Sequence, residues 1–140
     1  MTDDWREVVA VWVGDNGFMG TNASGGSVQI GSINEKPGIG PMEMLLLGVA
    51  GCTGMDIVSI LEKERQSLSG FKVIVSGKRR EEYPRIYTEI EIVYKLWGDG
   101  LKISSIERAI QLSEEKYCSA SAMLQAVAVI RSRYEINSTL

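Results

Sequence analysis

The amino-acid sequence predicts a single α+β domain over residues 1–140, and three observations point to that class. Several segments alternate apolar and polar residues with the period of two that a strand with one buried face requires. One long segment is almost free of charge, which is typical of a helix in a core. The segments follow the order of three strands, a helix, two strands, two helices and a final strand, which favours an α+β arrangement.

The first 40 residues predict a small antiparallel sheet and a loop. Residues 5–13 are rich in β-branched and aromatic side chains, which favours a strand. A Gly-Asp-Asn-Gly turn over residues 14–17 leads to two shorter strands, which we place at residues 18–22 and 27–30. Residues 32–40 form a loop that delivers the chain to the next element.

Residues 41–65 predict the helix around which the rest of the chain is organised. Pro41 suits the first helical position, where an N–H has no intrahelical partner to lose. Residues 44–55 carry no charge, and this run is too short to span a membrane and typical of a buried core helix. Gly70 is expected to end the helix after a frayed last turn.

One face of this helix combines small residues with a thiol. At helical spacing it carries Gly48, Gly51, Cys52 and Met55. A glycine in a helix interior costs about 1 kcal/mol relative to alanine, so the sequence needs a reason to keep several of them. We therefore expect another helix backbone or a ligand to pack closely against this face.

The second half of the chain begins with two predicted strands, at residues 71–80 and 87–96. Pro84 lies in the polar turn between them and blocks strand continuation. The second strand alternates cleanly, and its predicted inward face carries Thr88, Ile90, Ile92, Tyr94 and Leu96. One face of this sheet is therefore expected to be buried and the other solvated.

Two helices and a strand complete the expected fold. A capping box at Ser104 and Glu107 predicts the start of a helix, whose last turn at residues 114–116 is expected to be solvated. Residues 119–125 predict one more short helix. Residues 126–136 return to β-branched alternation and predict the last strand.

Composition limits the possible functions. The net charge of −3 and pI near 5.1 argue against nucleic acid as the main partner. Histidine is absent, which excludes Ser-His-Asp triads, Cys-His proteases and most metal sites. The N-terminus has acidic residues where a signal peptide has basic ones, so we expect a cytoplasmic protein with reduced thiols.

The two cysteines are the main candidates for chemistry. Cys52 and Cys118 stand 66 residues apart, so they form neither a CxxC motif nor a zinc-knuckle pattern. Most free cysteines are small core hydrophobes, and that alternative stays open for both. Two features favour reactivity. Glycines leave space beside the Cys52 sulfur, and Cys118 stands between two predicted helices, where the amides of the second can stabilise its thiolate.

Glu43 is a third candidate, and it has a structural alternative. It lies nine residues before Cys52, which is about 13 Å along a helix axis and half a turn out of phase. It therefore cannot touch Cys52 within one straight helix. The alternative is a first-turn glutamate that the positive end of the helix dipole favours.

Two blocks of the sequence resemble the OsmC/Ohr family, the osmotically inducible and organic hydroperoxide resistance proteins. They are PMEMLLLGVAGCTGMDIVSIL, from residue 41, and IERAIQLSEEKYCSASAML, from residue 106, and their separation and the order of elements match as well. The resemblance implies an OsmC-like fold, an intertwined homodimer with two β-sheets wrapped around long central helices. It also implies a thiol-dependent peroxidase that reduces organic hydroperoxides or hydrogen peroxide in oxidative-stress defence.

By its place in these blocks, Cys52 matches the family's peroxidatic cysteine and Cys118 its resolving cysteine. Peroxide would convert Cys52 to a sulfenic acid, a Cys52–Cys118 disulfide would follow, and a dithiol donor would restore both thiols. The family's catalytic glutamate directly follows the helix-starting proline; here Met42 takes that place and Glu43 comes next. The family's arginine comes from the N-terminal region, where this chain has Arg6 as its only arginine before residue 65. No cofactor or metal is implied.

A second function remains open beside the peroxidase. A dimer of the same fold with little peroxidase activity would bind a small apolar molecule or a partner.

Overall fold

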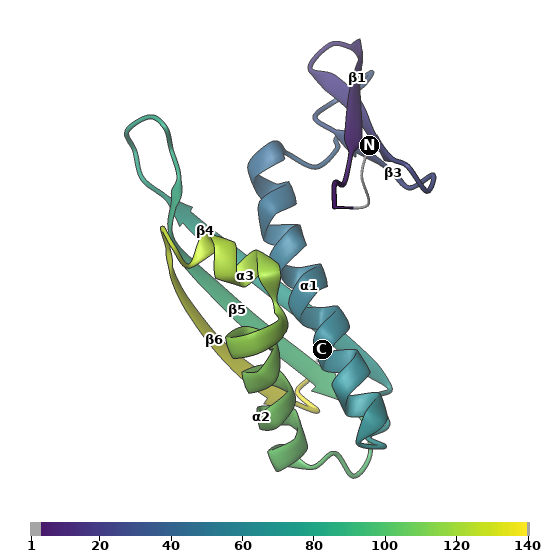
Figure 1. Ribbon diagram of the computed structural model, residues 1–140, viewed down its shortest axis with the longest axis vertical. Coiled ribbons are helices and arrows are strands. Elements are labelled where there is room, and N and C mark those ends of the chain that lie inside the picture. The colour runs from purple at the N-terminus through teal and green to yellow at the C-terminus, as the bar shows by residue number, and fades with distance from the viewer. Residues whose placement is uncertain (1–3, 140) are drawn as a thin grey trace. The chain divides into compact units, whose positions relative to one another are not determined.

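The computed structural model describes residues 4–139 and confirms the predicted α+β class (Figure 1). The chain forms two compact units, one extending to Met44 and the other beginning at Leu45. The long helix α1 (Pro41–Lys63) contributes residues to both. A single domain over residues 1–140 stays a prediction.

The N-terminal unit is a three-stranded antiparallel sheet in the order β1-β2-β3. Its strands are β1 (Val8–Gly14), β2 (Gly17–Asn22) and β3 (Ser27–Ile30). The turn between β1 and β2 holds Asp15 at a φ of 49°, a left-handed conformation that Asp tolerates better than most residues. The predicted antiparallel sheet is confirmed, although β1 begins at Val8 rather than at residue 5.

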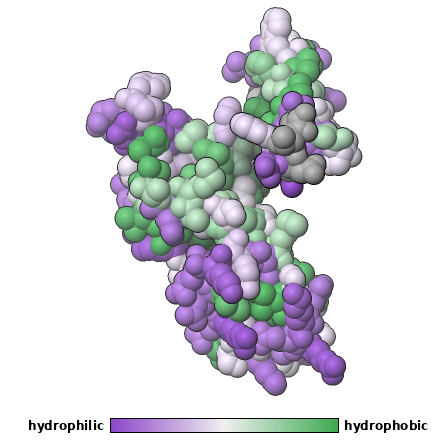
Figure 2. All heavy atoms as spheres, in the orientation of Figure 1, coloured by the Kyte–Doolittle hydropathy of each residue, from purple (hydrophilic) through white to green (hydrophobic). Residues whose placement is uncertain are grey.

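The N-terminal unit buries very little of its own surface. Among described residues 4–44, Gly17 alone is buried. Figure 2 shows apolar surface on this unit. Large apolar side chains are exposed on both faces of β1, on residue 5 before it and on β2: Val8, Val9, Val11, Trp12, Val13, Trp5 and Phe18. Consecutive residues of a strand point to opposite faces, so neither face of β1 is covered within this unit.

The C-terminal unit is built on a second three-stranded sheet in the order β4-β5-β6. Its strands are β4 (Gly70–Arg79), β5 (Tyr87–Trp97) and β6 (Val129–Ile136). β4 pairs antiparallel with β5, whereas β6 pairs parallel with it. The last strand starts at Val129 rather than at the predicted residue 126, because a turn in which Ala128 N–H donates to Leu124 O precedes it.

The two faces of this sheet differ as the sequence predicts. On the inward face of β5, Ile90, Ile92, Tyr94 and Leu96 are fully buried, while Thr88 at the end of the row is half-buried. On the other face, Arg131 of β6 pairs with Glu89 at 2.9 Å and with Glu91 at 3.0 Å. The solvated face is therefore held by ion pairs, and the core lies on the opposite side.

The helix α1 packs on the core side of the sheet. Its buried stripe repeats every four residues and consists of Val49, Thr53, Ile57 and Leu61. A Cβ on Gly54 would lie 3.5 Å from Val73 of β4, which places the helix directly against that strand. By length and composition alone α1 is apolar enough to cross a membrane. Its buried stripe makes it a core helix of this unit.

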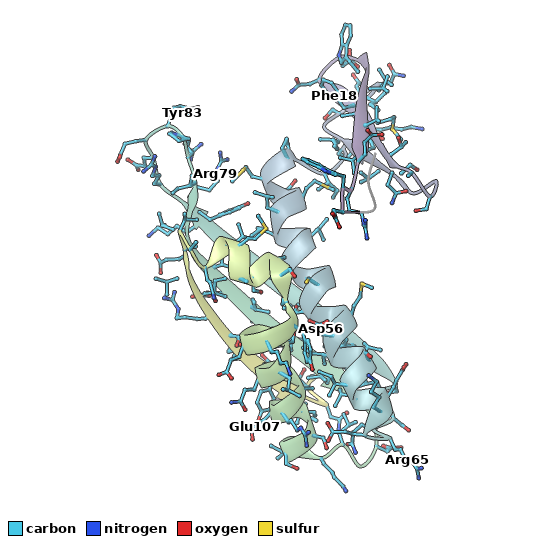
Figure 3. The ribbon with its side chains drawn as sticks, in the orientation of Figure 1. Phe18, Asp56, Arg65, Arg79, Tyr83 and Glu107 are labelled. Atoms are coloured by element: carbon cyan, nitrogen blue, oxygen red, sulfur yellow. The ribbon has the colours of Figure 1, made fainter. Side chains whose placement is uncertain are left out.

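The end of α1 differs from the prediction. The helix ends at Lys63, well before Gly70, which begins β4. Arg65 takes the left-handed conformation, with φ of 57°, and Figure 3 labels it at this end of α1. Arg65 N–H donates to Glu62 O and Gln66 N–H donates to Leu61 O, the two hydrogen bonds of a Schellman motif. An arginine occupies the position that glycine usually takes.

Three helical segments follow β5: α2 (Ile103–Leu112), the π-helix η1 (Ser113–Tyr117) and α3 (Ser119–Leu124). The predicted capping box is wrong. The N-cap of α2 is Lys102, whose side chain makes no cap hydrogen bond, and Ser104 lies inside the first turn. Lys102 N–H donates instead to the side chain of Gln66, which ties the start of α2 to the end of α1.

Candidate functional site

Cys52 comes from the middle of α1, in the C-terminal unit. It is half-buried and adjoins Thr53, which belongs to the buried stripe. Gly48 and Gly51 lie beside it on the open side of the helix, and within residues 45–139 a Cβ built on either would meet nothing within 4 Å beyond its chain neighbours and the adjacent backbone of α1. Cys52 therefore lies between the packed face of α1 and a face that no other part of residues 45–139 covers.

Cys118 lies between η1 and α3 and is 3% exposed. It is the N-cap residue of α3, and its sulfur accepts hydrogen bonds from the N–H of Ser121 at 3.3 Å and from the Ser121 hydroxyl at 3.1 Å. Its own N–H donates to Ser113 O at 2.7 Å. The expected position at a helix start is confirmed. Hydrogen bonds to Ser121 hold the sulfur, and the hydrogen bond to Ser113 holds the backbone of Cys118.

The two cysteines are neighbours in the folded unit. Burial raises the pKa of the Cys118 thiol, the two Ser121 hydrogen bonds oppose that rise, and hydrogen bonding and charge at Cys52 add to it. The sequence argument from helix amides identified a real contribution but not the larger one. Because desolvation outweighs the Ser121 hydrogen bonds, Cys118 is held as a neutral thiol in this environment.

Tyr94 lies behind the cysteines with its side chain fully buried. Its hydroxyl donates to Glu114 Oε2 of η1 at 2.6 Å. Burial, the hydrogen bond to Glu114 and the charge of Glu114 raise the pKa of Tyr94, in that order; Cys118 adds to the rise, and hydrogen bonding by Thr53 opposes it. The phenol therefore remains protonated and acts as a hydrogen-bond donor in the space between α1, η1 and Cys118.

Asp56 connects α1 directly to η1. Figure 3 labels Asp56 on α1. Its Oδ2 accepts a hydrogen bond from the Ser113 hydroxyl at 2.9 Å, and Ser113 is fully buried. Asp56 lies one helical turn after Cys52, and Ser113 is also the residue whose carbonyl accepts from Cys118 N–H. A charged residue in the apolar helix is thus explained by its contact with the segment that leads to Cys118.

Glu43 lies in the N-terminal unit, where its carboxylate closes the start of α1. Its Oε1 accepts a hydrogen bond from Gly40 N–H at 2.7 Å, three residues earlier. This is the glutamate half of a capping box, with Pro41 at the first helical position. The hydrogen bond from Gly40 N–H supports the alternative that Glu43 stabilises the start of the helix. The catalytic role of Glu43 stays a prediction. Within residues 4–139, no group of three or more Cys, Asp or Glu side chains could hold a metal ion.

Sequence reasoning missed Tyr94, Glu114 and Ser121 as parts of the site. The signal for Tyr94 was its place on the inward face of β5, since a buried phenol needs a partner for its hydroxyl. Glu114 was expected in a solvated helix turn, but it is half-buried and accepts from two hydroxyls. The π-helix causes this difference, because it changes the direction in which residues after Leu112 point.

A comparison with family models decides the relationship of this chain to known proteins. The family described as OsmC-like protein matches residues 34–132, a stretch that includes both cysteines and most of the C-terminal unit. The chain belongs to the OsmC-like family. The resemblance drawn from the two sequence blocks is thereby confirmed, and so is the OsmC-like fold.

The chain is similar to known proteins over most of its length. It is 38% identical to Protein YhfA of Escherichia coli K12 over 125 residues, which cover 89% of this chain and 93% of that protein. A hypothetical protein from Aquifex aeolicus VF5 has a crystal structure that matches with a TM-score of 0.81 and 34% identity, covering 96% of this chain and 98% of that one.

More distant structures share the fold. The organic hydroperoxide resistance protein OhrB of Bacillus subtilis matches with a TM-score of 0.61 at 15% identity, covering 94% of this chain and 98% of that one. At that level of identity the likeness establishes the fold and leaves the activity open.

Proposed function

We propose that this protein is a thiol-dependent peroxidase that reduces organic hydroperoxides or hydrogen peroxide in oxidative-stress defence. The observation that carries the proposal is the presence in one unit of two free cysteines 66 residues apart in sequence, one half-buried and one buried, with Cys52 contributing to the raised pKa of Cys118. Their different exposure fits two different roles, since the first must meet the substrate and the second must meet only the first. The cysteine-bearing segments lie within the part of the chain that matches the OsmC-like family.

The first step belongs to Cys52. Its thiolate attacks the terminal oxygen of the peroxide, so that an S–O bond forms and the O–O bond breaks. The leaving alkoxide or hydroxide takes up a proton and departs as an alcohol or water. Two electrons pass from sulfur to the peroxide, and Cys52 becomes a sulfenic acid. The open helix face beside Gly48 and Gly51 gives the peroxide its approach.

The second step belongs to Cys118. Its sulfur attacks the Cys52 sulfenic sulfur, an S–S bond forms, and the hydroxide that leaves combines with the Cys118 proton as water. Burial protects Cys118 from direct contact with peroxide in solution and keeps it available for this step. A dithiol then reduces the disulfide by two thiol–disulfide exchanges and is itself oxidised to a disulfide.

The proposal includes a homodimer. The N-terminal unit buries little of its apolar surface by itself. Only 22% of an apolar 18-residue stretch of α1 is buried within the chain. Exposed apolar area of this extent on one molecule marks an interaction surface. A second copy of the chain, with α1 against α1 and the N-terminal strands wrapped around the pair, would cover both surfaces.

Single substitutions of the two cysteines test the peroxidase. We expect Cys52→Ser to abolish peroxide consumption, because it removes the nucleophile. Cys118→Ser should still undergo one oxidation per subunit and leave a sulfenic acid that a dimedone-type probe labels. Mass spectrometry of the labelled protein gives the readout. Labelling of Cys118 in the Cys52→Ser protein would reverse the roles.

The raised pKa of Cys118 gives a pH dependence. A neutral buried thiol stabilises the folded state below the ordinary thiol pKa, and this stabilisation is lost as the pH rises through the raised folded-state pKa. In the Cys52→Ser protein we expect alkylation of Cys118 by iodoacetamide to be slow near neutral pH and to accelerate only above the range of a free cysteine. The urea-denatured protein provides the ordinary titration as a control.

A catalytic role of Glu43 is separated from its capping role by one conservative change. Glu43→Gln keeps an acceptor for Gly40 N–H, so the helix start and the melting temperature should be preserved. If the carboxylate acts in catalysis, peroxide turnover falls although the protein remains stable. Unchanged turnover would leave Glu43 with its cap alone.

The second candidate function is a dimer that binds a small apolar molecule without peroxidase activity. The observation that favours it is an apolar hollow of about 350 Å³ in the N-terminal unit, lined by residues that include Val8, Ala10, Val28, Ile30 and Met44. This function takes over if the wild-type thiols react with peroxide no faster than free cysteine does.

A further inference from the structure

A polar cluster in the C-terminal unit extends from the buried Tyr94 to the exposed Ser132, and neither step of the proposed reaction uses it. Its centre is the Glu114 carboxylate of η1, which accepts from Tyr94 at 2.6 Å and from Ser132 at 3.0 Å. The two donors come from the neighbouring strands β5 and β6. One carboxylate therefore fastens the π-helix to two strands of the sheet.

The strength of this attachment follows from its burial and its charge. Tyr94 is fully buried and Glu114 is half-buried, so water competes poorly for their hydrogen bond. Hydrogen bonds to an ionised carboxylate are about twice as strong as those between neutral groups. Because the raised pKa of Tyr94 keeps its proton in place, the phenol donates to Glu114 throughout the physiological range.

The attached segment leads directly to Cys118. Glu114 lies in the first turn of η1, and Cys118 immediately follows the last residue of that helix. Ser113, beside Glu114, accepts from Cys118 N–H at 2.7 Å and donates its hydroxyl to Asp56 of α1 at 2.9 Å. Asp56 is one turn along α1 from Cys52. The same five-residue helix is therefore tied to the sheet, to the helix of Cys52 and to the backbone of Cys118.

We propose that Tyr94 and Glu114 are positioning residues that hold η1 so that the Cys118 sulfur can bond to the Cys52 sulfur. This inference rests on the proposed pairing of the two cysteines, and it assigns no contact with peroxide to either residue. The step it concerns is the condensation of the Cys52 sulfenic acid with the Cys118 thiol to a disulfide and water. Attack of Cys52 on peroxide does not involve η1 and should not depend on it.

The expected effect is on the Cys52–Cys118 disulfide. A shift of about 1 Å in a reacting group lowers the rate of an intramolecular step by up to ~100-fold, so Tyr94→Phe should slow disulfide formation roughly 10- to 100-fold. The first oxidation of Cys52, followed by dimedone-type trapping, should keep its wild-type rate. The sulfenic acid then persists, and excess peroxide converts more of it to sulfinic acid.

The closing experiment measures the disulfide without peroxide. Purified full-length protein is equilibrated in glutathione redox buffers, and the fraction of Cys52–Cys118 disulfide is determined by mass spectrometry. We expect Tyr94→Phe and Glu114→Ala to shift the equilibrium toward the dithiol by about tenfold, which corresponds to roughly 30 mV for a two-electron couple. Glu114→Gln keeps an acceptor for both hydroxyls and should recover most of the shift.

Tyr134→Phe is the matched control. Tyr134 lies in β6 of the same sheet and is half-buried, and Glu107 of α2 contributes to the raised pKa of its phenol. Its loss should leave the disulfide equilibrium unchanged. Melting temperatures of all variants show whether a shift accompanies general loosening. If Tyr94→Phe loosens the protein, Ser132→Ala removes one donor to Glu114 from an exposed side chain and should give a smaller shift in the same direction.

Two outcomes overturn the inference. A wild-type equilibrium in Tyr94→Phe, Glu114→Ala and Ser132→Ala would show that η1 needs no such attachment. A wild-type protein that forms no disulfide in oxidising buffer would show that there is no pair to position. Failure of the peroxidase has a different signature, because the wild-type disulfide would then form in redox buffer while peroxide left both thiols unreacted.

Discussion

The two units of this chain differ in how much of their structure they support themselves. In the C-terminal unit, a sheet, α1 and the three helical segments that follow β5 bury a set of aliphatic side chains together with Tyr94 and Thr53. The N-terminal unit has three strands of similar regularity but buries only Gly17 among residues 4–44. In both sheets the central strand pairs with a strand on each side. Only the C-terminal sheet has a helix layer of its own.

This difference indicates which unit depends on a surface outside itself. A segment of about 40 residues rarely buries enough apolar surface to be stable alone, so the N-terminal unit requires a covering surface from outside itself. The cysteine pair, by contrast, lies entirely in the unit that builds its own core. We therefore expect substitutions in the N-terminal unit to act first on association, and substitutions around the cysteines to act first on redox chemistry.

The largest expected effect comes from placing a charge in β1. Val11 and Trp12 point to opposite faces of the strand and are 54% and 64% exposed in the single chain. If a second copy covers one face, Val11→Asp or Trp12→Asp buries an unpaired carboxylate and should convert the dimer to monomers. Light scattering after size-exclusion chromatography gives the mass.

The control for this change is Asn16→Asp, which adds the same charge in the exposed turn between β1 and β2 and should leave the mass unchanged. Retention of the dimer mass by both β1 variants would contradict a covered sheet. In that case the contrast between the two units would have to be explained without a second copy.

Substitutions of two glycines in α1 should have effects of intermediate size, one stabilising the fold and the other weakening the dimer. Gly54 faces β4, and an added Cβ would make ordinary contact with Val73 at 3.5 Å, so Gly54→Ala should stabilise the protein by up to about 1 kcal/mol. Gly51 meets nothing within residues 45–139. If a second α1 packs closely there, Gly51→Leu should weaken or abolish the dimer instead.

Sedimentation at a series of protein concentrations measures the second effect, and chemical denaturation measures the first. A Gly51→Leu protein with the wild-type dimer constant would show that no backbone approaches this face. The glycine would then be unexplained by packing, and substrate access to Cys52 would remain as its reason.

The sequence predicted the elements of both units well, because their patterns are local. Alternation in residues 87–96 reflects burial directly. The charge-free run identified α1, although within the chain only one stripe of that helix is buried. The parallel pairing of β6 was not predicted, since alternation records which face is buried and carries no information on strand direction. The two helix ends were misplaced because Arg65 and Lys102 take cap positions without the usual residue types.

For the site, the sequence identified both cysteines and their order but not the groups that fix them. The resemblance to the family assigned Cys52 and Cys118 their roles, which remain proposals. The Tyr94–Glu114 hydrogen bond joins residues 20 positions apart through a π-helix, and no periodic pattern predicts a π-helix. The direction of the pKa shift at Cys118 could not be predicted from the sequence either. Desolvation, its largest cause, depends on tertiary burial rather than on neighbouring amides.

The smallest expected effect is a gain in stability when a residue in the left-handed conformation is replaced by glycine. The same kind of substitution can be made in each unit. Arg65, with φ of 57°, follows the end of α1 in the C-terminal unit. Glu35, with φ of 66°, is one of the two residues in the turn between Ile33 and Lys36 in the N-terminal unit. The left-handed conformation costs a non-glycine residue roughly 1–2 kcal/mol, and glycine avoids this cost. Glycine also loses more conformational entropy on folding, which offsets part of the gain. Each change to glycine should therefore stabilise its own unit by up to about 1 kcal/mol.

Thermal unfolding then reports whether the units unfold together. If the dimer makes them one cooperative structure, Arg65→Gly and Glu35→Gly should raise the same transition by similar amounts. If the N-terminal unit unfolds separately, Glu35→Gly should leave the main transition where it is. Lys63→Gly, two residues before Arg65 and inside the helix, should lower stability by about 1 kcal/mol and serves as the control. A rise for Lys63→Gly as large as that for Arg65→Gly would show that the left-handed conformation is not the cause.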